Sequence, residues 1–340
     1  MPTRLFWMSL LLLAHLVVTP PAWAQAKPGA SLEICLAGAA DYTPVYPTSV
    51  FPAGATKEVT AVVRLGRGES YPTMTATWIA VEVPGTRPNF MINKIDMDLK
   101  GKDRAAVRFN HPEGLLAGKY RLEGATGGRP WKSAEFSVTP LASPEVKQPG
   151  DLFPMNPGTV WRYTFTQEFG RNIRPRLPAG MKLAADGKLR ASMTKTATKT
   201  DSVGTHIESR RNNELVEEEW WRLTDAGLVV AQMKSGDEVS TFDPPHPIWP
   251  WPLKTPREWS YEAPDKSFTQ KFRMWGPVPI KGPPGTAQGY VVLMEQPSPS
   301  IALSVERHYL PGIGMVREVV VQARNGVMLT RWENVLTARP

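Results

Sequence analysis

Phe153-Pro154, followed by Trp161-Arg162-Tyr163, recurs later in the chain as Trp251-Pro252, followed by Trp259-Ser260-Tyr261 at the same internal spacing. Each copy then leads to a related second element. In the first copy this element is Glu219-Trp220-Trp221 with Gly227-Leu228-Val229, and in the second it is Glu306-Arg307-His308-Tyr309 with Gly314-Met315-Val316. A repeated unit of proline turn and aromatic strand describes a scaffold. The duplication therefore predicts architecture and leaves the chemistry open.

Alternation of apolar and polar residues within each copy predicts β-strands. Trp161, Tyr163 and Phe165 would share one face of a strand, and residues 301–309 alternate in the same way. Residues 213–223 of the first copy are rich in Glu, Leu and Arg, which favour a helix. Because the matching stretch of the second copy has a clear period of two, we predict a strand there as well.

The repeated motifs also resemble a known group of proteins. An aromatic residue or Leu before Pro, then a turn and Trp-x-Tyr, with a later Tyr-x-x-Gly-x-Gly-x-Val, is similar to a pattern in poorly characterised bacterial envelope proteins and lipoproteins. Residues 153–163 and 309–316 carry it here. The resemblance covers the second domain and implies a curved, half-barrel-like antiparallel sheet that cradles a ligand. It implies no catalytic residues, and this chain lacks the lipid-attachment cysteine.

The N-terminal half has the pattern of a β-sandwich. Between residues 51 and 138, six short β-type runs alternate with turn residues. Residues 116–120, with Gly127-Gly128 and residues 134–138, resemble the closing hairpin of bacterial immunoglobulin-like domains. The resemblance places Tyr120 where a tyrosine corner bonds the backbone just upstream.

These patterns together predict an all-β protein with two folded domains. The expected order is a signal peptide (1–24), an extended leader (25–50), an immunoglobulin-like β-sandwich (51–138), a proline-rich linker (139–150), and a duplicated, curved antiparallel domain (151–340). The two copies within the last domain span about 153–240 and 251–336.

The first 24 residues have the features of a secretory signal. Arg4 precedes a mostly apolar run over residues 5–18, and Ala22-Trp23-Ala24 matches an A-x-A cleavage site. We predict cleavage after Ala24 and an exported chain, periplasmic or extracellular; the alternative is an uncleaved N-terminal anchor.

The single cysteine, Cys35, follows Glu33-Ile34, which is not the context of a lipoprotein signal. We therefore predict no lipid anchor. We expect Cys35 to be a small buried hydrophobe, with an intermolecular bridge or a reactive thiol as the alternative.

The positive charge of the chain is concentrated in one segment. Residues 171–200 contain eight basic residues against one acidic residue, Asp186. Such a segment suits anionic envelope material, such as lipid headgroups or an acidic polysaccharide, including peripheral contact with an anionic membrane surface. The alternative is a solvated loop. Nucleic acid is excluded as a partner because the segment lacks aromatic residues for base stacking. The residues of this predicted patch are Arg171, Arg174, Arg176, Lys182, Lys188, Arg190, Lys195 and Lys199.

Tryptophan provides the candidate ligand contacts. Residues 242–253 contain five prolines, which exclude a helix and a central strand and predict an extended crossover between the copies. Trp249 and Trp251 on this segment would form an aromatic lip for a lipid, glycan or peptide, together with Trp220 and Trp221. The alternative packs the crossover rings over the open end of the core. Trp161 and Trp259, by contrast, are expected to be core residues from their place in strand-like alternation.

Catalytic signatures are absent from the sequence. It has no G-x-S-x-G, H-E-x-x-H, C-x-x-C or complete phosphate-binding loop, and its histidines are too dispersed to predict a metal site. No cofactor is expected. The best enzymatic candidate is the Glu217-Glu218-Glu219 cluster, since glycosidases use paired carboxylates. On a strand Glu217 and Glu219 would face one way and Glu218 the other, which also fits a salt-bridged face or a charged, solvated edge.

The sequence therefore favours an exported, non-catalytic binding or envelope-accessory protein. Its second domain would hold an apolar or amphiphilic ligand, or a partner protein, between the sheet and the Trp-Pro crossover. The alternatives are a hydrolase acting on glycans through Glu217 to Glu219 and a structural component of an envelope assembly.

Overall fold

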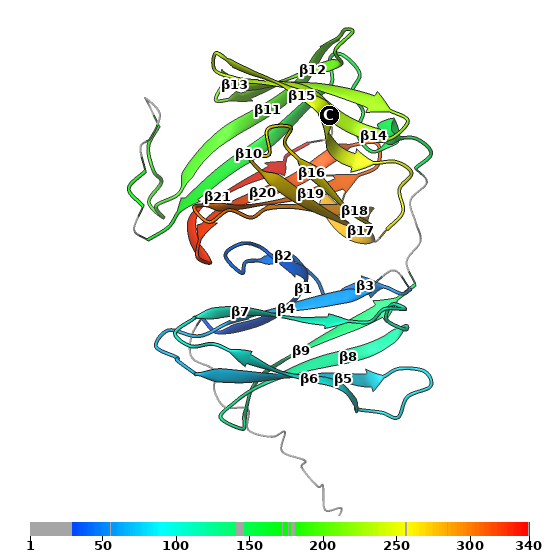
Figure 1. Cartoon of the computed structure of the whole chain (residues 1–340), viewed down its shortest axis with the longest axis vertical. Coiled ribbons are helices and arrows are strands. Elements are labelled where there is room, and N and C mark those ends of the chain that lie inside the picture. The colour runs from blue at the N-terminus through cyan, green and yellow to red at the C-terminus, as the bar shows by residue number, and fades with distance from the viewer. Residues whose placement is uncertain are drawn as a thin grey trace, which may run out of the picture.

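The computed structural model describes residues 29–340 except 55, 141–145, 172, 176, 178–180, 256, 284 and 339, so the predicted signal peptide and residues 141–145 of the predicted linker lie outside the described residues. In the described part nearly every regular element is a strand, apart from the 3-10 turn η1 (Pro149–Asp151). The all-β prediction is confirmed. Figure 1 shows a smaller sandwich below and a large curved sheet above.

The smaller domain is built from two facing sheets. One has the order β2-β1-β4-β7 and the other β3-β9-β8-β5-β6. Trp78 on β5 stacks on Phe109 of β7 with ring centroids 5.5 Å apart, which joins the two sheets through the core. The nine strands are β1 (Ser31–Gly38), β2 (Pro44–Pro47), β3 (Val50–Pro52), β4 (Glu58–Arg64), β5 (Thr73–Glu82), β6 (Phe90–Asp98), β7 (Arg104–Asn110), β8 (Gly118–Thr126) and β9 (Arg129–Thr139).

The Tyr120 hydroxyl donates a hydrogen bond to the Leu116 carbonyl at 2.8 Å, which is the bond expected of a tyrosine corner.

The sandwich begins earlier than the sequence predicts. Residues 31–47, assigned by their composition to an extended leader, instead form β1 and β2, and β1 pairs with both β2 and β4. Few β-branched residues mark β1, so its strand identity depends on partners that are distant in sequence. Cys35 on β1 is buried, and its thiol donates to the Ala37 carbonyl at 3.1 Å. This burial confirms the expected small buried hydrophobe, and it raises the pKa of the thiol to about 12.

The larger domain is one nearly closed antiparallel sheet of twelve strands, in the order β15-β14-β13-β12-β11-β10-β21-β20-β19-β18-β17-β16. Each copy of the repeat contributes six consecutive strands, and the pairing of β10 with β21 joins the copies. The first copy forms β10 (Val160–Phe169), β11 (Leu189–Thr200), β12 (Thr205–Arg211), β13 (Glu214–Thr224), β14 (Gly227–Ser235) and β15 (Glu238–Pro250). The second forms β16 (Arg257–Glu262), β17 (Thr269–Gly282), β18 (Gly285–Gln296), β19 (Ala302–Leu310), β20 (Gly314–Arg324) and β21 (Val327–Leu336).

Two predictions about individual strands are confirmed. Residues 214–223 of the stretch 213–223 lie in β13, so it is a strand, as the duplication indicates, although its composition favours a helix. The proline-rich stretch forms most of β15, which pairs only with β14 and is therefore an edge strand. Proline lacks the N–H that a central strand needs, so the position of this proline-rich stretch at the edge of the sheet has a direct physical cause.

The duplication extends to irregularities in the strand pairing. The register shifts between Trp220 and Trp221 in the first copy and between His308 and Tyr309 in the second. Trp221 and Tyr309 are thus equivalent, as are Glu219 and Arg307 two residues earlier. Gly314 supports this geometry because its φ is +94° and a Cβ there would lie 2.8 Å from the ring of Phe153.

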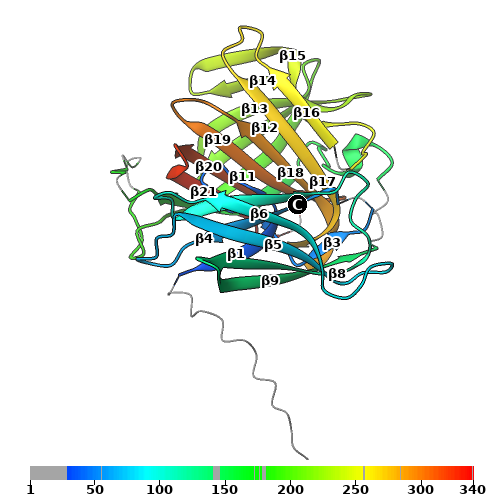
Figure 2. The same cartoon turned by 60° about the horizontal axis from the view of Figure 1, so that its bottom comes forward.

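The sandwich packs on the outer face of the second copy. The backbone N–H of Tyr46, on β2, donates to the Glu306 carboxylate at 3.1 Å, and its ring lies edge-on to His308 at 5.3 Å. Beside them on β18, Val291 and Leu293 are buried on the same outer face. Figure 2 shows the two domains in contact from another side.

Candidate functional site: the charged interior of the curved sheet

One end of the sheet interior is filled by rings. Phe153, just before β10, packs with ring centroids 4.6 Å from Trp161, 4.7 Å from Trp221 and 6.3 Å from Trp249. Trp249 in turn lies edge-on to Tyr309 at 4.6 Å. We call these five buried residues the aromatic layer. It links β10, β13, β15 and β19, so strands of both copies share one apolar base.

A group of charged side chains shares this inner face. Directly paired residues on neighbouring strands point to the same side of a sheet. Lys195 is paired with Trp161, and Arg307 is paired with Glu318. The Lys195 ammonium lies 3.1 Å from the Glu219 carboxylate. The Arg307 guanidinium lies 2.8 Å from the Glu318 carboxylate. We define the interior charge cluster as Lys195, Glu217, Glu219, Arg307 and Glu318.

The cluster lies directly against the aromatic layer. Glu219 and Arg307 come two residues before Trp221 and Tyr309, so each charge neighbours a ring on the same face. The Lys195 nitrogen is 5.7 Å from the centre of the Trp221 ring. Solvent still reaches the group. The exposed side-chain fractions are 12% for Lys195, 14% for Glu219, 11% for Glu318 and 28% for Arg307.

Glu217 is the cluster member whose pKa is shifted into the neutral range. The negative charge of Glu219, and then burial, raise the pKa of Glu217 to about 7. Lys195 and Arg307 act in the opposite direction, while Glu318 adds to the rise. The two copies therefore influence each other electrostatically across the interior. Among the described residues Glu217 has no hydrogen bond or ion pair of its own.

Further polar groups on this face lack protein partners. Ser209 lies between Lys195 and Glu217 in the strand register, and the residue is only 2% exposed. Asn334, 4% exposed, donates to Glu318 at 3.1 Å through its amide nitrogen. Within the described residues the Ser209 hydroxyl and the Asn334 amide oxygen have no hydrogen-bond partner. An unmet buried polar group costs about 1–3 kcal/mol, so such groups are ready to bind a polar ligand.

A second set of polar side chains connects the two edge strands of the sheet, β15 and β16. β15 and β16 share no backbone pairing. Instead, His246 of β15 lies 2.5 Å from the Gln270 amide oxygen on β17, and Gln270 donates to Gln296 at 2.9 Å. Burial lowers the pKa of His246, which favours the neutral ring at neutral pH. The seam is thus held by side chains, including the contact of His246 with Tyr261 at 4.8 Å.

The raised pKa of Glu217 predicts a pH-dependent stability. A carboxyl with a pKa of about 7 in the folded chain and 4.5 unfolded keeps its proton on folding between those values. Its contribution to stability therefore falls as the pH rises from 4.5 through 7, by as much as about 3 kcal/mol. Glu217→Gln should match the wild type near pH 4.5 and exceed its unfolding free energy at pH 8, measured by urea denaturation.

Glu218→Gln is the matched control on the opposite face. Its pKa is lowered by the hydrogen bond from Lys234, so its contribution is present above pH 4.5 and is lost as the pH falls. This variant should be less stable than the wild type at pH 8. Equal pH profiles for the wild type and Glu217→Gln would contradict the assigned titration.

The four predicted tryptophan contacts do not converge on one site. Trp221 and Trp249 are buried in the aromatic layer, because Phe153 covers them from the start of the domain. The prediction that Trp249 forms part of an aromatic lip is wrong, because its side chain is buried in the core. Trp220 lies on the outer face, stacked on His206 at 4.5 Å. Trp251 is half-buried at the end of β15.

The predicted basic patch is also dispersed, because β11 is a regular strand from Leu189 that alternates its side chains between two faces. Lys195 thereby turns inward into the charge cluster. Three others make ion pairs at the surface, which weakens the expectation of a single anion-binding loop. The pairs are Lys188–Glu168 at 2.6 Å, Arg190–Asp186 at 2.6 Å and Lys199–Asp201 at 3.7 Å. Arg171, Arg174 and Lys182 are exposed, and Arg176 lies outside the described residues.

The glutamate triplet behaves as strand geometry predicts. Glu217 and Glu219 face the interior, while Glu218 faces outward and contacts His206 and Lys234, each at 2.9 Å. The alternative of a solvated edge is wrong, since β13 lies between β12 and β14. Sequence reasoning missed the roles of Arg307 and Glu318. The sequence feature that could have indicated them is Arg307 itself, a single arginine on the apolar face of the alternating strand over residues 301–309.

No group of three or more His, Cys, Asp or Glu side chains within the described ranges could hold a metal ion. No helix within those ranges is long and apolar enough to cross a membrane.

Comparisons with known proteins assign no family. No protein-family model matches the sequence, and no curated protein matches it either. One solved structure is similar, a chain from Bacteroides fragilis NCTC 9343 whose name describes an exported protein with a YmcC-like fold. The two share 12% identity and a TM-score of 0.26, over 56% of this chain and 98% of that chain.

Proposed function

We propose that this is an exported, non-catalytic binding or envelope-accessory protein whose curved sheet holds an amphiphilic ligand. The observation that carries the proposal is the interior charge cluster resting on the aromatic layer. Buried ion pairs add little to stability, and replacing them with apolar side chains is often neutral or favourable. A sheet that needed only to be stable would have an apolar interior, so charges there indicate a binding role.

The arrangement suits a ligand with one polar and one apolar part. The Ser209 hydroxyl and the Asn334 amide oxygen have no protein partner among the described residues, and the Glu217 carboxyl beside them is a further hydrogen-bonding group. Trp259 and Trp332 are half-buried on the same inner face and offer apolar contact. Lipids and glycolipids of a cell envelope combine these two chemistries, and the signal-like sequence of residues 1–24 predicts delivery to that compartment.

Native mass spectrometry of the full chain, purified from the compartment to which it is exported, tests the proposal. We expect a bound small molecule that is released on denaturation and changes tryptophan fluorescence when it is added back. A variant with Lys195→Met and Glu219→Met should carry far less of it. Ligand-free wild-type protein, or equal loading of the variant, would overturn the proposal. Copurification of a protein in place of a small molecule would support the accessory-partner alternative.

One observation also favours a glycan-acting hydrolase as a second candidate function. Glu217 has a pKa of about 7 beside Glu219 on the same face, and glycosidases separate the acidities of two carboxyls in this way. A protonated Glu217 would be the general acid. Turnover of cell-wall glycans that is unchanged in Glu217→Gln, or absent in the wild type, would remove this candidate.

A further inference from the structure

The two ends of the curved sheet differ in what they present. Consecutive strands of each copy are antiparallel neighbours, so their connections alternate between the two ends. The aromatic layer lies at one end, because Trp161 is near the start of β10 while Trp221 and Trp249 are near the ends of β13 and β15. At the opposite end, four connections lie next to one another around the sheet. We call these connections, β10–β11, β12–β13, β18–β19 and β20–β21, the rim.

Every rim connection exposes a large aliphatic side chain in or beside its turn. The exposed fractions run from 38% to 66%, with the sandwich in place. Single exposed aliphatic residues are common, but among the described residues the opposite end of the sheet has only Leu223. Apolar exposure gathered at one place marks an interaction surface. The rim aliphatic residues are Leu183, Leu215, Ile301 and Val327.

The rim also carries uncompensated positive charge on its β10–β11 connection. Three cations there are exposed and, within the described ranges, form no ion pair; they are Arg171, Arg174 and Lys182. Asp186 on the same connection is already paired with Arg190 at 2.6 Å. Arg324 and Glu214, beside two other rim turns, offset each other in net charge. The rim therefore suits a partner that is negatively charged and accepts apolar side chains.

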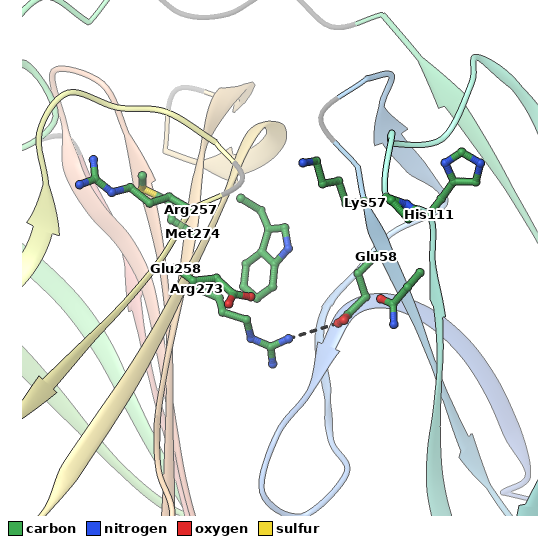
Figure 3. A pocket seen from close by; sticks show the side chains of 10 residues that line it. Lys57, Glu58, His111, Arg257, Glu258, Arg273 and Met274 are labelled. Atoms are coloured by element: carbon green, nitrogen blue, oxygen red, sulfur yellow. Dashed lines mark hydrogen bonds and ion pairs between the residues drawn. The ribbon is translucent and has the colours of Figure 1, made fainter.

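The sandwich is held against the sheet without covering the rim. The Arg273 guanidinium of β17 lies 3.2 Å from the Glu58 carboxylate of β4, across the gap between the domains (Figure 3). Tyr42 reaches the edge of the rim, since a Cβ at Gly326 would lie 3.1 Å from its ring, yet Val327 stays exposed. The β20–β21 hairpin and the β10–β11 connection both lie on the left of Figure 1. A broad, flat partner can reach them together.

We propose that the rim docks on the surface of an anionic lipid bilayer. The aliphatic side chains enter the headgroup region, and the three cations of the β10–β11 connection contact lipid phosphates. Binding of this kind depends on buried apolar area together with attraction to anionic lipids. The docking goes beyond the ligand-holding role and does not depend on it, because the rim side chains lie outside the charged interior. It turns the end of the interior opposite the aromatic layer toward the bilayer.

Vesicle flotation with the full chain tests the two parts of the rim. Vesicles of phosphatidylcholine and phosphatidylglycerol in equal parts should bind the protein, and binding should weaken as the salt concentration rises. Pure phosphatidylcholine vesicles should bind at least about tenfold more weakly. The charge variant Arg171→Gln/Arg174→Gln/Lys182→Gln should lose at least about tenfold in affinity for the mixed vesicles. The apolar variant Leu215→Ser/Val327→Ser should lose about tenfold.

Two control variants should bind the mixed vesicles like the wild type. Leu223→Ser changes a side chain that is 44% exposed at the opposite end of the sheet, and Lys195→Met/Glu219→Met alters the interior. All rim substitutions are at exposed positions, so retained folding is expected and is checked by circular dichroism. Wild-type protein that fails to bind the mixed vesicles, or rim variants within about twofold of its affinity, would overturn the proposal. Equal loss in either control variant would overturn the rim as the docking surface.

Fluorescent labels test which end of the sheet meets the bilayer. Val327→Cys and Leu223→Cys each receive an environment-sensitive dye, and buried Cys35 should stay unlabelled in the folded chain. Mixed vesicles should brighten the dye at position 327 and leave the dye at position 223 unchanged. The same response at both positions would overturn the orientation. Binding to soluble polygalacturonate, with the mixed vesicles left unbound, would assign the cations to an acidic glycan and overturn membrane docking.

Discussion

Replacing Glu306 with leucine should lower the unfolding free energy by about 3–5 kcal/mol and loosen the sandwich from the curved sheet. The Glu306 side chain is 7% exposed and accepts hydrogen bonds from three groups. These are the His308 ring at 2.5 Å, the Arg317 guanidinium at 3.1 Å and the Tyr46 backbone N–H at 3.1 Å. Leucine would leave a buried histidine and the backbone N–H of β2 without their acceptor.

Urea denaturation and limited proteolysis measure the two parts of this effect. Domain loosening should expose the segment 139–150 to protease at lower denaturant than in the wild type. Burial raises the pKa of Glu306, but His308 and Arg317 lower it below its ordinary value overall. The contribution of Glu306 is therefore present above its unfolded pKa and is lost as the pH falls. Glu306→Leu should show less acid sensitivity than the wild type.

The duplication supplies the control for this prediction. Glu218 is the equivalent of Glu306 in the first copy and bonds His206 and Lys234 on an outer face that no domain covers. Glu218→Leu should destabilise the sheet less and leave domain contact unchanged. Equal proteolytic exposure in both variants would show that Glu306 does not hold the domains together.

Period-two alternation predicted the strands around Trp161 and over residues 301–309, and the duplication extended that prediction to 213–223. Alternation could not show which face of each strand would be enclosed, because that depends on how twelve strands curl together. Lys195 illustrates the difficulty. In sequence it belongs to a basic run, and only the pairing of β11 with β10 places it beside Trp161. The burial of Trp249 likewise depends on Phe153, nearly a hundred residues earlier in the chain.

The interior charge cluster could not be predicted from the duplication, because the two copies have different residues at the equivalent positions. The pairing registers of the two copies place Phe272 where the first copy has Lys195, and Val305 where it has Glu217. Within the described strands, one inner position is charged in both copies, and there the signs differ: it is Glu219 in the first copy and Arg307 in the second. The repeat thus builds the frame, while the polar interior arises from differences between its copies.

The largest difference in unfolding free energy is expected between the single variant Glu219→Met and the double variant Lys195→Met/Glu219→Met. Glu219→Met alone leaves the Lys195 ammonium, 12% exposed, without its partner at 3.1 Å and should cost about 3–5 kcal/mol. Adding Lys195→Met removes the uncompensated charge and fills the same space with an apolar side chain. The double variant should recover to wild-type stability or exceed it by about 1–4 kcal/mol.

A double-mutant cycle in urea measures this coupling directly. If the double variant were as unstable as the two single changes added together, the pair would be a structural requirement of the sheet. Recovery of stability together with loss of bound ligand would separate the two roles. The ion pair would then be dispensable for folding and required for binding, which is the distinction on which the proposed function depends. Because both side chains face the same interior as Glu217, the recovered double variant should also show an altered Glu217 titration, with Glu219 no longer raising its pKa.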